Sequence, residues 1–75
     1  MEAFEEAVRR QRRIDAHLRA AEMHEREADR HLGAAQRFES RGESELAAHE
    51  RELVDHERYL AEYDRRNARD LGVLT

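Results

Sequence analysis

Apolar residues recur along this chain at steps of three and four, the spacing of one face of an α-helix. A first series runs from residue 4 to residue 38 and consists of Phe4, Ala7, Val8, Ile14, Leu18, Ala21, Ala28, Leu32, Ala35 and Phe38. A second series with the same spacing combines apolar residues with two histidines and consists of Leu46, His49, Leu53, His56, Leu60 and Tyr63. Because no proline interrupts either series, we predict two helices, over about residues 2–40 and 43–69.

One strong break separates the two predicted helices, at residues 40–44. Gly42 can adopt the left-handed backbone conformation that ends helices. Glu43 and Ser44 supply an acidic and a hydroxyl side chain where the next helix begins. The pattern therefore predicts a single all-α domain over residues 1–75, an antiparallel two-helix hairpin with its turn at 40–44.

The composition indicates that this hairpin is not stable alone. Of its 75 residues, 43% are charged and 39% are hydrophobic. Between Leu18 and Leu32, the first helix offers only alanines and Met23 as apolar residues. A domain this small and polar buries too little apolar surface. We therefore expect self-association into a homodimer that forms a four-helix bundle, or into a higher oligomer. The first helix should outreach the second by about ten residues.

All five histidines lie on two ladders with seven-residue steps, His17/His24/His31 and His49/His56. Seven residues are nearly two helical turns, so each ladder occupies one stripe of its helix. An apolar residue stands three positions before each histidine; these residues are Ile14, Ala21, Ala28, Leu46 and Leu53. The spacing predicts that the imidazoles lie on, or border, the face that the helices bury against one another.

The hairpin, folded about Gly42, places Glu27 nearly level with His56, and His31 nearly level with Glu52. Each helix then contributes one Glu-x-x-x-His pair, whose members stack on one helix face. Two imidazoles and two carboxylates suit zinc, iron, manganese or cobalt. We therefore predict a divalent transition-metal site, zinc or similar, at these four residues. Further candidate ligands on the same ladders are His17, His24 and His49.

A simpler interpretation of the histidines needs no metal. With 18 acidic residues in the chain, several Glu-to-His spacings of four are expected by chance. The Glu-x-x-His spacing of the diiron carboxylate bundles does not occur, because an apolar residue stands three positions before every histidine. The imidazoles would then be partly solvated spacers at the edge of the helix contact, hydrogen-bonded to flanking glutamates.

An alternative function depends on the arginines near the start of the chain, Arg9, Arg10, Arg12 and Arg13. Such a cluster can contact phosphates, so the alternative is a dimeric hairpin regulator that binds RNA or DNA. The architecture resembles the plasmid-encoded Rop-type hairpin dimers, which bind RNA loops. The net charge of −4 and the acidic residues among the arginines disfavour a continuous basic stripe.

The sequence lacks the signals that are typical of several other classes of protein. The chain has no cysteine, which excludes disulfides and thiolate metal sites. No apolar run approaches the roughly 20 residues of a membrane span. The first residues lack the order of a signal peptide, so we expect a cytoplasmic protein that does not enter membranes. No glycine-rich phosphate loop or nucleophile motif occurs, which indicates a non-enzymatic role.

The stretch 20–31, together with residues 34–35, 42–43 and 47–56, resembles small bacterial helical proteins rich in histidine and alanine, with repeated Ala-Ala-x-x-His units. The similarity covers about residues 17–65. It implies a helical hairpin that interacts with metal and supplies no activity. Leu32, Phe38 and Tyr59 stand where such proteins favour histidine, which argues against bulk metal storage. We thus expect a self-associating binding or scaffold protein, whose partner is itself or an unknown protein.

Overall fold

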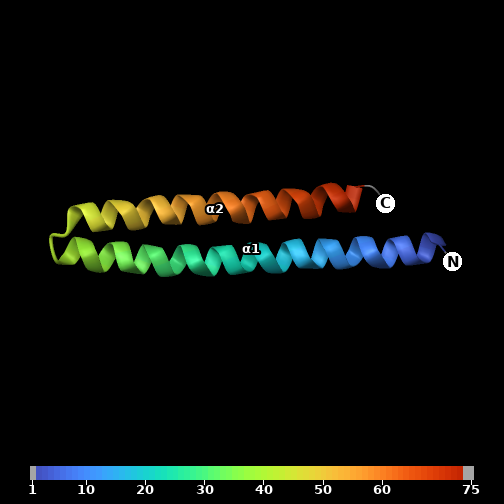
Figure 1. The fold of residues 1–75 in the computed structure, drawn as a ribbon, viewed down its shortest axis with the longest axis horizontal. Coiled ribbons are helices and arrows are strands. Elements are labelled where there is room, and N and C mark those ends of the chain that lie inside the picture. The colour runs from blue at the N-terminus through green and yellow to red at the C-terminus, as the bar shows by residue number, and fades with distance from the viewer. Residues whose placement is uncertain (1, 74–75) are drawn as a thin grey trace.

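The computed structural model describes residues 2–73 and consists of two long α-helices joined by a tight turn (Figure 1). Helix α1 spans Glu2–Ser40 and helix α2 spans Ser44–Val73. The helices run antiparallel, side by side, and form a rod with dimensions of 61 × 14 × 10 Å. The all-α helical hairpin is confirmed. Helix α2 continues to Val73, beyond the expected end near residue 69. Of the expected domain, residues 1, 74 and 75 lie outside the described range.

The turn between the helices has the hydrogen bonds that glycine-terminated helices use. Gly42 has a φ of +73°, in the left-handed region that only glycine adopts readily. The Gly42 N–H donates to the Glu39 carbonyl at 3.0 Å, and the Glu43 N–H donates to the Phe38 carbonyl at 2.9 Å. These two bonds form a Schellman motif, which satisfies carbonyls at the end of α1. The first bond into α2 runs from the Ala47 N–H to the Glu43 carbonyl, at 3.0 Å.

The buried core is a narrow stripe of small side chains between the two helices, which we call the seam. Within residues 2–73 the buried residues are Ala21, Ala28, Ala35, Ala47, Val54, Ala61 and Ala68. On each helix they recur every seven residues, so each set keeps to one face. Six of the seven side chains are a single methyl group, which lets the two helix axes approach closely. No large side chain in the described chain is fully buried.

The stripe predicted on the second helix lies beside the contact with α1 and does not fill it; its members Leu53 and Leu60 are half-buried. Ala47, Val54 and Ala61 fill the seam, each one position after a leucine of the predicted stripe. Leu46 keeps 49% of its surface exposed, and Tyr63 keeps 53%. Two series with the same seven-residue period lie one residue apart on α2, so periodicity alone does not choose between them. The small residues win because the alanines of α1 leave room only for small neighbours.

We predict that enlarging a seam residue destabilises the hairpin. Ala28 is 2% exposed, and a leucine there would force the helices apart, so Ala28→Leu should cost about 1–3 kcal/mol of unfolding free energy. Ala48→Leu is the control, because Ala48 lies exposed on α2 and should change stability by less than about 0.5 kcal/mol. Urea unfolding at one protein concentration measures both. Equal stability of the Ala28→Leu variant and the native chain would contradict the close-packed seam.

Candidate functional site

Three histidines of α1 bond three carboxylates of α2 across the seam. The Nδ1 atom of His17 lies 2.8 Å from Asp64 Oδ1, that of His24 lies 2.6 Å from Glu57 Oε2, and that of His31 lies 2.6 Å from Glu50 Oε2. Each step of seven residues along α1 is matched by a step of seven back along α2. The pairs therefore hold one constant antiparallel register over four helical turns.

These pairs alternate with the small buried residues along the seam. On α1, Ala21 lies between His17 and His24 at steps of four and three. On α2, Ala61 lies between Glu57 and Asp64, also at steps of four and three. A seam that repeats at three and four residues is the contact surface of a coiled coil. Here every second layer of that surface is a histidine–carboxylate pair rather than an apolar contact.

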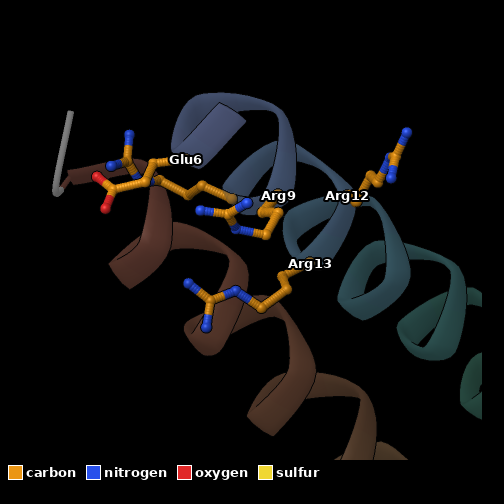
Figure 2. A pocket seen from close by; sticks show the side chains of 5 residues that line it. Glu6, Arg9, Arg12 and Arg13 are labelled. Atoms are coloured by element: carbon orange, nitrogen blue, oxygen red, sulfur yellow. The ribbon is translucent and has the colours of Figure 1, made fainter. Parts of the chain in front are cut away.

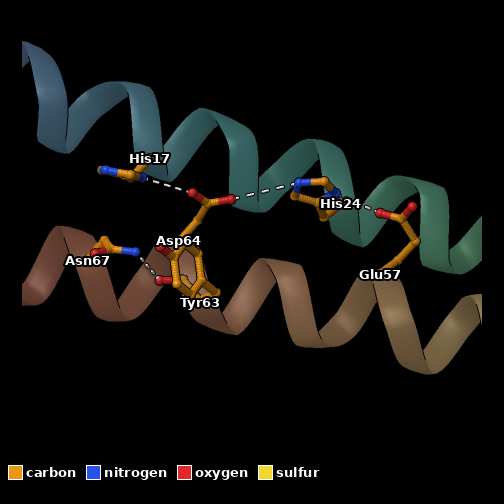
Figure 3. A network of polar contacts seen from close by, with 6 residues as sticks. All are labelled: His17, His24, Glu57, Tyr63, Asp64 and Asn67. Atoms are coloured by element: carbon orange, nitrogen blue, oxygen red, sulfur yellow. Dashed lines mark hydrogen bonds and ion pairs between the residues drawn. The ribbon is translucent and has the colours of Figure 1, made fainter.

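Two of the pairs join into one polar network (Figure 3). Asp64 lies between two imidazoles, with Oδ1 bonded to His17 and Oδ2 at 3.7 Å from His24 Nε2. Because His24 Nδ1 bonds Glu57, both ring nitrogens of His24 face carboxylates. An ionised carboxylate can only accept hydrogen bonds. The imidazole is therefore the donor, and each bonded Nδ1 carries a hydrogen.

The seam pairs are only partly open to water. The side chains of His24 and Glu57 are each 19% exposed, and that of Asp64 is 14% exposed. Partial removal from water strengthens the attraction within each pair, and it also raises the cost of leaving either partner alone. No side-chain nitrogen or oxygen buried in the described residues lacks a hydrogen-bond partner. The polar layers are thus satisfied within the hairpin.

A second set of ion pairs links the helices along one edge of the seam. Glu25 pairs with Arg65, and Glu39 pairs with Arg51, whose Nε lies 2.8 Å from Glu39 Oε1. The hydrogen bond that the Arg65 guanidinium donates to Glu25 raises the pKa of Arg65, which stays charged at all ordinary pH values. These four side chains are roughly one third to one half exposed, so each pair adds little stability. We call this side of the rod the charged face.

The four residues of the predicted metal site do not converge. His31 bonds Glu50 rather than Glu52, and Glu27 pairs with Arg30 at 3.2 Å. Glu52 and His56 are exposed on α2. Counting residues from the turn fixes the level along the rod, but it does not fix the direction in which each side chain points. The expected geometry is therefore corrected: Glu52 and His56 lie on the outside of α2.

The remaining candidate ligands also separate into two groups. His17 and His24 lie in the seam with His31, as the ladder on the first helix predicted, whereas His49 is exposed like His56. Within residues 2–73, no three histidine, aspartate or glutamate side chains are grouped so that they could hold a metal ion. Metal binding by this chain stays a prediction.

Sequence reasoning missed the carboxylates that do reach the histidines, Glu50, Glu57 and Asp64. A signal for them was present, because they recur every seven residues on the second helix, as the histidines do on the first. The seam residues Ala47, Val54 and Ala61 each stand three positions before one of them. The simpler interpretation, in which the imidazoles bond glutamates at the edge of the contact, comes nearer to this arrangement.

The arginine cluster of the alternative function lines a surface pocket on the N-terminal part of α1. Arg9, Arg10, Arg12 and Arg13 form this pocket together with Glu6 (Figure 2). In the register of the seam pairs, residues 9–13 lie level with residues 68–72 near the end of α2, whose ribbon runs beside the arginines in Figure 2. None of the four arginines forms an ion pair within residues 2–73. They are free to meet an anion, and nucleic-acid binding stays a prediction.

Comparisons with protein-family models, with curated proteins and with solved structures found no match to this chain. The resemblance to histidine- and alanine-rich hairpin proteins therefore stays a prediction. Neither α1 nor α2, over the residues described, combines the length and apolar character that crossing a membrane requires.

We predict strong coupling between His24 and Glu57. Changing either residue alone to leucine leaves its partner without its seam bond, and His24→Leu should cost about 1–2 kcal/mol of unfolding free energy. The double change restores a layer of matched apolar side chains, so its stability should return to within about 1 kcal/mol of the native chain or exceed it. A double-mutant cycle from urea unfolding should give a coupling of at least about 1 kcal/mol.

The control cycle uses Glu62 and Arg69, an ion pair within α2 at 3.1 Å whose side chains are largely exposed. Leucine at both positions should reveal a coupling below about 0.5 kcal/mol. Equal coupling in the two cycles would show that the seam pair contributes no more than a surface pair does.

Proposed function

We propose that this protein is a non-enzymatic, self-associating helical hairpin that serves as a scaffold or binding module, with a second copy of itself as its first partner. One observation supports this role, the distribution of apolar side chains between the inside and the outside of the rod. The buried residues of the described range 2–73 are six alanines and one valine. The large apolar residues that remain exposed are Phe4, Leu18, Met23, Leu46, Tyr59, Tyr63 and Val73.

The energetics of burial support assembly. Hydrophobic stabilisation grows with the apolar area removed from water, and an alanine contributes a single methyl group. Fixing the backbone of every residue in two long helices opposes folding throughout the chain. The polar layers of the seam add little net stability beyond satisfying their own groups. A second hairpin that covers the exposed leucines and tyrosines would supply the missing burial, as in four-helix bundles.

Metal coordination is not part of this proposal, because three of the five imidazoles already direct Nδ1 to a carboxylate across the seam. Nucleic-acid binding through the arginine pocket is the less favoured function. Four carboxylates lie on the same stretch of α1 as the four arginines and equal them in charge; they are Glu2, Glu5, Glu6 and Asp15. A balanced stretch attracts a phosphate backbone more weakly than a basic stripe does.

We predict that the native chain is a dimer whose stability depends on concentration. Native mass spectrometry and sedimentation equilibrium should give twice the 8.9 kDa mass of one chain. The thermal midpoint measured by circular dichroism should rise over about a hundredfold increase in protein concentration, because mass action favours the assembled state. A monomer at every concentration, with a constant midpoint, would contradict the proposed function.

A further inference from the structure

The polar ladder of the seam continues one step beyond its last histidine–carboxylate pair, and there it lacks a carboxylate. Arg10 stands seven positions before His17 on α1, and Leu71 stands seven positions after Asp64 on α2. The register of the seam pairs sets Arg10 level with Leu71. Both residues are half-buried. A cation thus occupies a seam position opposite an apolar side chain, and a partly buried charge without an opposite charge destabilises the fold.

The helix surface beside Arg10 carries further positive charge. Arg9 and Arg13 are four positions apart, and Arg10 and Arg13 are three positions apart, so these guanidinium groups are neighbours on α1. Like charges at these spacings destabilise a helix. None of the three arginines forms an ion pair within residues 2–73. The repulsion is therefore not relieved by a carboxylate bound to any of them.

The three arginines and Glu6 surround the arginine pocket (Figure 2). Glu6 stands three positions before Arg9 and four before Arg10, and it is the only carboxylate among the described residues that line the pocket. Arg12 also lines it, but its side chain points away from Arg9 and Arg13 in Figure 2. The other acidic residues of this stretch are outside the lining; they are Glu2, Glu5 and Asp15. The stretch as a whole is balanced in charge, whereas the pocket itself is strongly positive.

The charge and size of the arginine pocket suit a compact polyphosphate. Planar guanidinium groups bind phosphate oxygens through paired, charge-assisted hydrogen bonds. Several positive charges against one negative charge attract a multivalent anion more strongly than a monovalent one. The pocket has a volume of 510 Å³, which admits more than one phosphoryl group. Beyond the pocket, exposed acids such as Glu22 and Glu25 lie among the arginines of α1, so a long phosphate backbone has no continuous basic stripe to follow.

We propose that Arg9, Arg10 and Arg13 form a binding site for a compact polyphosphate anion, whose charge takes the place of the carboxylate that the seam lacks opposite Arg10. Arg12 lies at the rim of this site. The bound anion lies among guanidinium groups that otherwise repel one another, so it should also stabilise the folded hairpin. This inference goes beyond the proposed self-association and does not depend on it.

Two sources supply this chemistry, free inorganic polyphosphate and the phosphate tail of a nucleotide. A second pocket, lined by Phe4, Glu5, Val8, Arg9 and Arg12, shares its two arginines with the arginine pocket. Phe4 keeps 69% of its surface exposed, and an aromatic ring can stack with a nucleobase. Tighter binding of adenosine triphosphate than of tripolyphosphate would assign the site to nucleotides, whereas equal affinity would assign it to inorganic polyphosphate.

Calorimetric titration of the full chain with tripolyphosphate tests the site, at about 0.15 M salt to screen distant charges. The native chain should bind one anion. The double variant Arg10→Gln, Arg13→Gln should bind at least about tenfold more weakly, because two charge-assisted contacts are lost. The matched control Arg19→Gln, Arg26→Gln removes the same charge from exposed positions of α1 outside the pocket. It should bind like the native chain.

A further variant, Glu6→Gln, tests the site by a gain of affinity. Removing the carboxylate from the pocket should tighten tripolyphosphate binding about threefold, because the repulsion between Glu6 and the anion is lost. Its control is Glu22→Gln, at an exposed position of α1 outside the pocket, which should leave the affinity unchanged. Circular dichroism follows the helix content of every variant, and a gain of affinity does not arise from misfolding.

The absence of binding by the native chain would overturn the proposal. Equal weakening in the two arginine double variants would also overturn it, because it would show a diffuse attraction to all the arginines of α1. An oligonucleotide that binds more tightly than tripolyphosphate, and that loses affinity in both double variants, would assign these arginines to nucleic acid instead. Binding is expressed per chain, so a monomeric native protein would contradict the proposed self-association without changing the outcome of this test.

Discussion

The structure depends on how closely its two helices approach. Methyl-sized side chains at every second layer hold the helix axes near each other, and only groups that satisfy one another across the narrow gap can occupy the layers between. Histidine on α1 and a carboxylate on α2 meet that condition, because an imidazole N–H bonds an acceptor-only oxygen. A one-residue slip would break every pair at once, so the polar layers specify the register while the alanines set the separation.

The close approach has a consequence for the outside of the rod. Residues too large for the seam, the leucines of α2 among them, are displaced to its flank, where Leu46 stays half-exposed. The flank then carries the same three-and-four spacing as the seam. One sequence pattern, offset by one residue, thus occurs both in the seam and on its flank.

The sequence predicted the helices and the turn because those features depend on local rules. Unbroken three-and-four periodicity requires helix, and Gly42 stands where a left-handed residue is needed. The rotation of α2 about its own axis was not predictable from the pattern, since the series of Leu53 and that of Val54 share one period. The expected convergence of Glu27, His31, Glu52 and His56 was wrong for the same reason. Glu52 and His56 lie nearly level with the expected partners along the rod, but their side chains are exposed on the outside of α2. Glu50 bonds His31 instead.

The tautomer of each neutral imidazole tests the histidine–carboxylate bonds of the seam most directly. Long-range proton–nitrogen NMR spectra at about pH 9, where ordinary imidazoles are uncharged, distinguish hydrogen on Nδ1 from hydrogen on Nε2. The seam requires the Nδ1–H form at His17, His24 and His31, because each donates to a carboxylate of α2. His49 and His56, which are exposed, should show the Nε2–H form that water favours. Five identical imidazoles in the solvent-favoured form would contradict the seam.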